Sequence, residues 1–251
     1  MGARLRLAGK VAVITGGSSG IGLAIAREFT AEGAQVAIFG RNEEALQKAS
    51  AQLPEALTVQ GDVTSNADLE RLFHETVSRF DKVDIVVANA GVATFLPIDK
   101  VDEEAFDKMV DVNFKGSFFT VQKALPHLKK GSSIILVSSN AHAMGVPTAS
   151  VYCGTKAAVR SLARTLSAEL IGQGIRVNCL SPGPTETPIF GKMGMSEAQL
   201  IATREHMKKQ VPLKRMAAPR EMATVAVFLA SNDSSFIVGE DILADGGWIA
   251  L

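Results

Sequence analysis

Tyr152, the only tyrosine in the sequence, stands thirteen residues after Ser139 and four residues before Lys156. Residues four positions apart share one face of a helix, so a helix at this point would aim a phenol and an ammonium into the same space. Bringing a phenol from its ordinary pKa of about 10 toward neutrality takes about 3 to 4 kcal/mol, and a cation about 4 Å away supplies about that much. The spacing therefore predicts an acid/base pair with a serine hydroxyl beside it, although Tyr-x-x-x-Lys alone also fits an ordinary amphipathic helix.

A glycine-rich turn follows the first apolar run of the chain. The β-branched run at 11–15 leads into Thr-Gly-Gly-Ser-Ser-Gly-Ile-Gly, with a helical pattern directly after it. A strand, a tight turn and a helix start in this order form a cradle for phosphate, because glycine permits close approach and the helix offers free amides. The turn therefore predicts a dinucleotide site, and its binding residues are Gly16, Ser18, Ser19, Gly20, Ile21 and Gly22.

Composition narrows the class of protein. The 26 basic and 26 acidic residues cancel, so no electrostatic footprint for nucleic acid or for an anionic membrane is expected. Only two cysteines, Cys153 and Cys179, occur, and neither has metal-ligand spacing; we expect no metal site and a reducing, cytoplasmic location. No run is long enough for a signal peptide or a membrane span.

The order of elements predicts the fold class. Apolar strand candidates at 11–15, 35–39, 56–60, 83–88, 133–138, 175–180 and 241–244 alternate with helical patterns at 20–32, 43–52, 66–79, 103–129, 152–172 and 219–231. We expect an α/β fold: a single domain over 1–251, with a doubly wound parallel sheet of about seven strands and helices on both faces. Residues 182–214 interrupt the rhythm with prolines and glycines and are expected to form a substrate loop or lid.

Further motifs follow in order along almost the whole chain: Asp62-Val63, Asn89-Ala90-Gly91, Asn113, Ser138-Ser139, and Pro182-Gly183 with Thr187 five residues after Pro182. Together with the turn from Thr15 to Gly22 and the pair Tyr152 and Lys156, they make the sequence resemble the short-chain dehydrogenase/reductase family. The resemblance implies a Rossmann-type fold, a nicotinamide cofactor and hydride transfer between a carbonyl and a secondary alcohol on a small-molecule substrate. It implies that Tyr152 is the acid/base, Ser139 polarises the carbonyl, Lys156 lowers the pKa of the tyrosine and binds ribose, and Asn113 holds a water. The same resemblance adds cofactor contacts from Asp62, Val63, Asn89, Ala90, Gly91, Tyr152, Lys156, Pro182, Gly183 and Thr187.

The second strand candidate ends in Gly40-Arg41-Asn42, where a dinucleotide enzyme meets the adenosine ribose. An enzyme specific for NAD places a carboxylate there, whereas Gly40 leaves the position without charge and Arg41 offers a fork of donors to phosphate. Arg41 and Asn42 are thus the predicted adenosine-end contacts, and we expect NADP(H) rather than NAD(H). Glu43 and Glu44 argue the other way, unless they pair with the positive end of a helix.

Several alternatives stay open at this point. A 3-oxoacyl-[acyl-carrier-protein] reductase would need a basic docking patch, for which Lys123, Lys129 and Lys130 are candidates; a cofactor sensor that has lost catalysis would not need the proton donors. Enoyl reductases of similar fold generally have a wider tyrosine-to-lysine separation. The substrate, its stereochemistry and the reaction direction are not indicated. Candidate substrate-pocket or lid residues are Phe95, His142, Met144, Val146, Ile189, Phe190, Met193 and Met195.

Two features of the sequence carry more than one interpretation. His142, where relatives often have glycine, suits either a substrate contact or a packing role, and Cys153 beside the tyrosine suits packing. The apolar ending around Trp248 is unusual for a chain terminus and suggests subunit contacts. Relatives commonly form tetramers, so we expect a homotetramer.

Overall fold

Seven apolar runs form one parallel sheet with the strand order β3-β2-β1-β4-β5-β6-β7. The structure, a computed structural model, describes residues 5–188 and 196–251. The strands are β1 (Val11–Thr15), β2 (Gln35–Gly40), β3 (Leu57–Gln60), β4 (Ile85–Ala88), β5 (Ser133–Val137), β6 (Arg176–Pro182) and β7 (Asp241–Ala244). Every position of β1, β4 and β5 is buried, because helices cover both faces of the sheet. The predicted fold class is confirmed, and each strand ends within about two residues of its predicted bounds.

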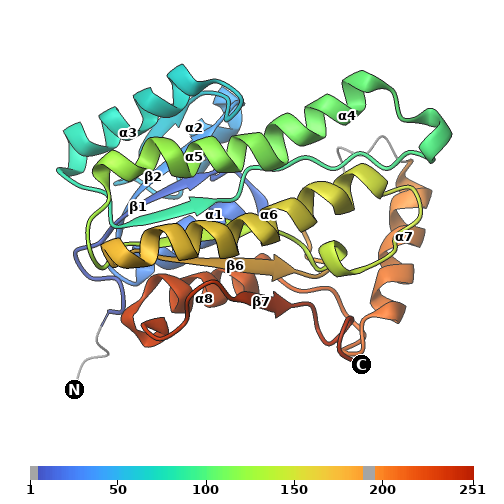
Figure 1. Cartoon of the computed structure of the whole chain (residues 1–251). Coiled ribbons are helices and arrows are strands. Elements are labelled where there is room, and N and C mark those ends of the chain that lie inside the picture. The colour runs from blue at the N-terminus through green and yellow to red at the C-terminus, as the bar shows by residue number, and fades with distance from the viewer. Residues whose placement is uncertain (1–4, 189–195) are drawn as a thin grey trace.

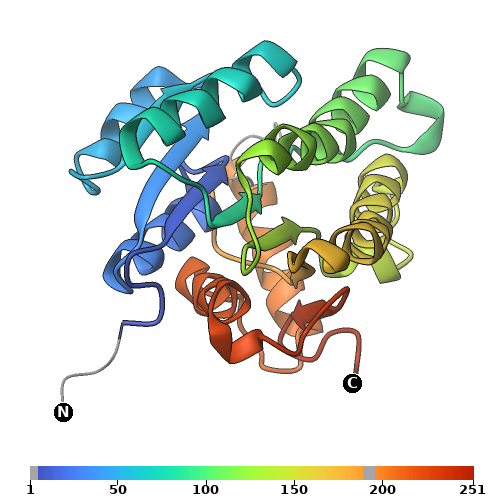
Figure 2. The same ribbon diagram turned by 60° about the vertical axis from the view of Figure 1, so that its left-hand side comes forward.

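Helices flank the sheet on both sides (Figures 1 and 2). They are α1 (Gly20–Ala31), α2 (Glu43–Ser50), α3 (Asn66–Phe80), α4 (Glu103–Met109), α5 (Gly116–Ala124), α6 (Ser150–Leu170), α7 (Glu197–Gln210) and α8 (Pro219–Ala230). Apolar side chains of α1, α2 and α8 share one core with the sheet, and those of α3, α5 and α6 share the other. The two cores hold the strands rigidly, so the loops at the strand ends are well placed to carry a site.

The single long helix predicted over 103–129 consists of four successive helical segments, two of which are not α-helical. Between α4 and α5 lies a π-helical turn, η2 (Val110–Lys115), and after α5 the chain tightens into the 3-10 turn η3 (Leu125–His127), which contains a proline. Hydrophobic periodicity does not distinguish a π turn from an α-helix, which is why the break was not predicted. Other 3-10 turns are η1 (Ile98–Lys100), η4 (Asn140–Ala143), η5 (Ile171–Gln173) and η7 (Asn232–Ser234).

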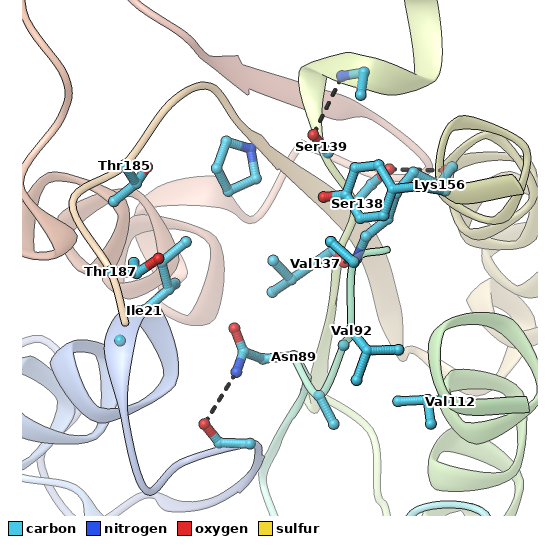
Figure 3. A pocket seen from close by; sticks show the side chains of 18 of the residues that line it. Ile21, Asn89, Val92, Val112, Val137, Ser138, Ser139, Lys156, Thr185 and Thr187 are labelled. Carbon is cyan, nitrogen blue, oxygen red and sulfur yellow. Dashed lines mark hydrogen bonds between the residues drawn. The ribbon is translucent and has the colours of Figure 1, made fainter. Parts of the chain in front are cut away.

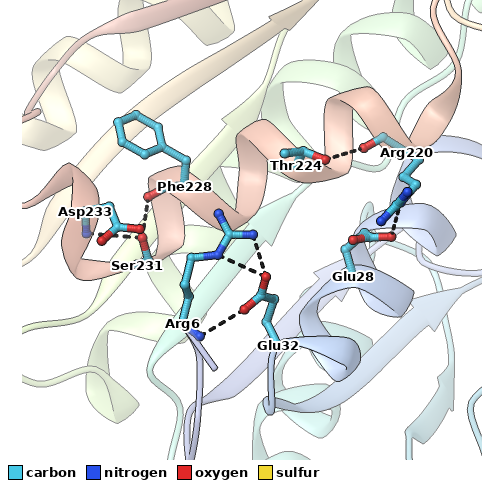
Figure 4. A network of polar contacts seen from close by, with 8 residues as sticks. All are labelled: Arg6, Glu28, Glu32, Arg220, Thr224, Phe228, Ser231 and Asp233. Carbon is cyan, nitrogen blue, oxygen red and sulfur yellow. Dashed lines mark hydrogen bonds and ion pairs between the residues drawn. The ribbon is translucent and has the colours of Figure 1, made fainter. Parts of the chain in front are cut away.

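The segment before β1 contacts the carboxyl end of α1 through Arg6. The guanidinium and backbone amide of Arg6 donate to the carboxylate of Glu32, just beyond α1, and Arg220 of α8 pairs with Glu28 of α1 at 2.7 Å (Figure 4). The Arg6 hydrogen bonds lower the pKa of Glu32. These contacts fix the carboxyl end of α1, whose other end faces the glycine-rich turn. Among the described residues, no helix has the length and apolar character needed to cross a membrane.

Candidate active site

A cavity of about 600 Å³ opens at the carboxyl ends of the strands. Its walls come from the ends of β1, β2, β3, β4, β5 and β6 and from the C-terminal segment, so residues far apart in sequence meet there, as expected for an open parallel sheet. Figure 3 shows Ser139 and Lys156 on one side of the cavity and Ile21, Asn89 and Thr187 on another. Every residue that we predicted for catalysis or cofactor binding, apart from Gly22 and Asn113, lines this cavity.

The glycine-rich turn needs its glycines for steric reasons. Gly16 and Gly20 have φ angles of 65° and 55°, which other residues rarely adopt. A Cβ on Gly22 would lie 2.3 Å from the carbonyl oxygen of Gly16, so a side chain there would push the turn apart. Ser19 precedes α1 and, within the described chain, makes no side-chain cap hydrogen bond to it. The first amides of α1 thus remain available to an anion such as a dinucleotide phosphate.

Asn89 organises this turn from the end of β4. Its side-chain amide donates to the carbonyl oxygens of Thr15 at 3.0 Å and Gly16 at 3.3 Å, while its own backbone amide donates to the Thr15 hydroxyl at 3.1 Å. Asn89 therefore lines the cavity and also braces its floor. This second role requires contact between two neighbouring strands and was not predicted.

At the far end of the cavity lie Gly40, Arg41 and Asp62. A Cβ on Gly40 would lie 3.1 Å from Ser18 Oγ, so a side chain there would require the serine hydroxyl to shift by a few tenths of an ångström. Arg41 is largely exposed, and its Nη1 lies 3.4 Å from Asp62 Oδ2. An exposed pair of this kind contributes about 0 to 1 kcal/mol, so the guanidinium is easily redirected. The carboxylate of Asp62 also accepts from the backbone amide of Thr64 at 3.0 Å, which fixes the turn after β3.

Asn42, predicted as a cofactor contact, lines the cavity and also caps α2. Its side-chain oxygen accepts from the backbone amide of Ala45 at 2.7 Å. Glu43 and Glu44 occupy the first turn of α2, where their charge complements the helix dipole, and Glu44 pairs with Lys48 at 2.6 Å. This arrangement agrees with the interpretation that the two glutamates belong to the helix rather than to a ribose site.

Ser139 lies between β5 and the 3-10 turn η4. The amide of Ala141 donates to its hydroxyl oxygen at 3.2 Å, so the hydroxyl proton remains available to another acceptor. Tyr152, in the first turn of α6, faces this serine, and its ring lies 5.7 Å from that of Phe95 between centroids. Burial raises the pKa of Tyr152, and a hydrogen bond with Ser139 works in the opposite direction. The phenol is therefore neutral near pH 7, held against a hydroxyl.

Lys156 is buried beneath the tyrosine. Its ammonium donates to the carbonyl oxygen of Val137 at 3.0 Å and lies 5.9 Å from the centroid of the Tyr152 ring. Burial lowers the pKa of Lys156 to about 8. Lys156 is not among the groups that shift the pKa of Tyr152, which is raised rather than lowered, because the loss of hydration on burial exceeds the effects that favour the phenolate.

Asn113 sits in the π turn, fully buried, at the back of the site. Its side chain accepts from the amide of Val92 at 2.8 Å, donates to the carbonyl of Val92 at 2.9 Å and donates to Thr155 Oγ1 at 3.1 Å. Gly91 lies between this amide and the ammonium of Lys156. Asn113 thus joins three segments of the site, with its side chain committed to protein partners.

The remaining wall of the cavity is mainly apolar and includes Phe95, Met144, Val146, Met207 and Trp248. Met207 of α7 and Trp248 of the C-terminal segment were not predicted here; Trp248 had been associated with subunit contacts. Among the described residues His142 does not line the cavity, and its imidazole faces Asp241 of β7 instead. The candidates Ile189, Phe190, Met193 and Met195 lie outside the described residues.

Residues 16–249 match the family model described as enoyl-(acyl carrier protein) reductase. The chain is 45% identical to the oxidoreductase asL5 of Sarocladium schorii, with 98% of each chain covered. The chain belongs to the short-chain dehydrogenase/reductase family. It is also 39% identical to an L-fucose dehydrogenase of Mus musculus, over 98% of this chain and 91% of the relative.

Solved structures of the family share the whole fold. A dehydrogenase/reductase from Sinorhizobium meliloti 1021 superposes with a TM-score of 0.91 at 30% identity and 98% coverage of both chains. A short-chain type dehydrogenase/reductase from Mycobacterium marinum gives the same TM-score at 32% identity, covering 99% of this chain and 98% of its own. The protein is thus an oxidoreductase of the short-chain type, from a family that binds nicotinamide cofactors.

Proposed function

We propose that the protein is an NADP(H)-dependent enzyme that interconverts ketones and secondary alcohols, with Tyr152, Ser139, Lys156 and Asn113 as its catalytic group. The observation that carries the proposal is that Ser139, Tyr152 and Lys156 line one cavity, with the buried Lys156 ammonium 5.9 Å from the centroid of the Tyr152 ring. The cofactor supplies or accepts a hydride when bound. The protein's task is then to hold the carbonyl oxygen and to move one proton.

The protonation states favour reduction. A carbonyl that gains a hydride develops negative charge on oxygen, which the Ser139 hydroxyl and the neutral Tyr152 phenol can both stabilise by donating hydrogen bonds. Because burial raises the pKa of Tyr152, the proton-donating form predominates at neutral pH. Alcohol oxidation needs the phenolate and therefore becomes more favourable as the pH rises.

Preference for NADP(H) rests on Gly40 and Arg41. No carboxylate stands at the end of β2, and the exposed Arg41 guanidinium lies beside the cavity with only a weak tie to Asp62. A charge-assisted contact of about 1.5 to 3 kcal/mol corresponds to a preference of about 10-fold to 150-fold. Catalytic efficiencies with NADPH and NADH test this: Arg41→Ala should lose the preference and leave NADH use nearly unchanged. Equal efficiencies in the wild type would refute the assignment.

The competing functions have weaker support. Lys129 and Lys130 precede β5 and therefore lie at the amino end of the sheet, opposite the cavity, and Lys123 pairs with Glu70 at 2.7 Å. A carrier-protein patch beside the site thus lacks its basic candidates. The separation of four residues between Tyr152 and Lys156 argues against an enoyl reductase, despite the description of the family model. A non-catalytic sensor would not need the paired hydroxyls.

Domain organisation, assembly and location are part of the same proposal. We take 1–251 as one catalytic domain whose lid spans about 182–214 and includes α7. Large apolar side chains are exposed on η1, α4 and α5 (Ile98, Phe106 and Phe118) and near β7 (Phe236 and Leu243), which supports two sets of subunit contacts and a homotetramer. The free thiols of Cys153 and Cys179 support a cytoplasmic location. Light scattering at micromolar concentration tests the tetramer.

The decisive experiment is NADPH oxidation against a panel of ketones, acetoacetyl thioesters, steroids and sugars, with L-fucose included because of the named relative. Tyr152→Phe should lower turnover by about 100-fold or more while NADPH binding stays nearly intact. Lys156→Ala should lower turnover and also weaken NADPH binding. A Tyr152→Phe enzyme with normal turnover would remove the phenol from the mechanism.

A further inference from the structure

A buried carboxylate lies behind the candidate catalytic serine. Asp241 opens β7, and its side chain is 5% exposed. Its Oδ1 accepts a hydrogen bond from Ser181 Oγ of β6 at 2.6 Å. Its Oδ2 lies 2.7 Å from His142 Nε2 and 3.6 Å from Arg160 Nε. One side chain thus contacts three elements, and none of these three partners has a role in the proton transfer proposed above.

His142 connects this carboxylate to Ser139. It belongs to η4, the turn that Ser139 begins, and its backbone amide donates to the carbonyl oxygen of Ser139 at 3.1 Å. The next contact in the same turn is from the Ala141 amide to the Ser139 hydroxyl. A shift of the His142 side chain would therefore move the short turn η4, and with it the Ser139 hydroxyl that precedes this turn.

Arg160 connects the same carboxylate to α6. Tyr152, Lys156 and Arg160 follow one another at intervals of four residues, so they lie along one edge of the helix. Asp241 consequently reaches both segments that carry the reacting groups: the η4 turn with Ser139 and helix α6 with Tyr152. The separation of η4 and α6 sets the distance between the Ser139 hydroxyl and the Tyr152 phenol.

Asp241 accepts one short hydrogen bond, from Ser181, and lies close to the side-chain nitrogens of His142 and Arg160. Nε2 of His142 lies 2.7 Å from Oδ2, although the two groups are not aligned for a hydrogen bond. The titratable groups around the carboxylate are His142 of η4, Arg160 of α6 and Cys179 of β6. Burial and the charge of Asp241 raise the pKa of Cys179 to about 12, so this thiol stays neutral. Loss of either His142 or Arg160 would leave Oδ2 of this buried carboxylate with fewer polar partners.

We propose that Asp241 is a positioning residue that acts through His142 to hold the η4 turn, and with it the Ser139 hydroxyl, against Tyr152. The expected effect on catalysis rests on the proposed function. A displacement of about 1 Å at a reacting group can cost up to about 100-fold in rate, so loosening one anchor is expected to act mainly on kcat.

The kinetic test compares Asp241→Asn, His142→Gln and the double variant. Each single change should lower kcat about 10-fold and leave KM for NADPH within about 2-fold, because the cofactor cradle is untouched. The double variant should be no worse than Asp241→Asn alone, since His142→Gln breaks a contact that Asp241→Asn already weakens. Asp81→Asn is the matched control: it removes an exposed carboxylate at the carboxyl end of α3, which precedes β4 and so lies at the amino end of the sheet, and it should leave kcat unchanged. Additive losses, or normal kcat in His142→Gln, would overturn the proposal.

A second measurement does not require turnover. Hydrogen exchange of the Ala141 and His142 amides should become at least about 10-fold faster in Asp241→Asn and in His142→Gln, while exchange in β5 stays unchanged. Unchanged exchange at these amides would refute the positioning role. A wild-type protein inactive on every carbonyl would refute the proposed function instead, and the exchange data would still decide between a held and a free turn. If Asp241→Asn fails to fold, His142→Gln answers the same question.

Discussion

Lys156 is expected to cost the folded protein stability, and Lys156→Met should therefore raise it at neutral pH. In the folded chain the ammonium is 5% exposed, and its pKa falls from 10.5 to about 8 because burial penalises the charge. This depression corresponds to about 3 kcal/mol at pH 7. Methionine removes the charge but also the hydrogen bond to Val137, which is worth about 1 kcal/mol. The net gain is about 2 kcal/mol, or about 4 to 8 °C in Tm for a chain of this size.

The sign of the pH dependence follows from linkage. Below about pH 8 both the folded and the unfolded chain hold the Lys156 proton, so the penalty is fully present. Between about pH 8 and 10.5 the unfolded chain keeps a proton that the folded chain has lost, so the wild type gains stability relative to the variant as pH rises. Thermal unfolding of both proteins, at equal concentration and from pH 7 to 10.5, measures the difference. A variant that is less stable at pH 7, or an advantage that does not shrink with pH, would contradict the reasoning.

Three further predictions address other parts of the site. Asn113→Ala should lower the free energy of unfolding by about 3 kcal/mol in urea titrations, because three hydrogen bonds are lost, including both to Val92; a loss below about 1 kcal/mol would show that solvent replaces them. Gly22→Ala should weaken NADPH binding at least about 10-fold in a fluorescence titration, since its Cβ would meet the Gly16 carbonyl; unchanged affinity would mean that the turn adapts at no cost. Trp248→Ala should raise KM for apolar ketones about 10-fold with KM for NADPH unchanged, and the opposite pattern would place the indole beside the cofactor.

Most of the architecture was predictable because apolar runs and glycine-rich turns are local signals. The strands and most helices appear where periodicity indicated them, and the glycine turn stands between β1 and α1 as expected. Helix α7 was not assigned because it has no buried residue and therefore no apolar face to recognise. The π turn around Asn113 was missed because it depends on backbone hydrogen bonds that side-chain patterns do not report.

The parts of the site that sequence reasoning missed all depend on contacts between distant segments. Asn89 was recognised as a cavity residue, but its grip on Thr15 and Gly16 requires β4 to lie beside β1. His142 was left between two interpretations because its partner, Asp241, lies 99 positions later in the chain. The sequence predicted that Trp248 would lie at a subunit interface. In the structure Trp248 lines the cavity, because the chain turns back after β7.

The bracing of the glycine-rich turn by Asn89 has a consequence for the entropy of cofactor binding. Because the side-chain amide fixes two carbonyl groups of the turn during folding, this part of the chain has little conformational freedom left to lose when a ligand arrives. The free energy gained from contacts with a pyrophosphate is then reduced very little by the cost of ordering the glycine-rich turn. The turn is therefore expected to receive a phosphate group without rearranging its own backbone.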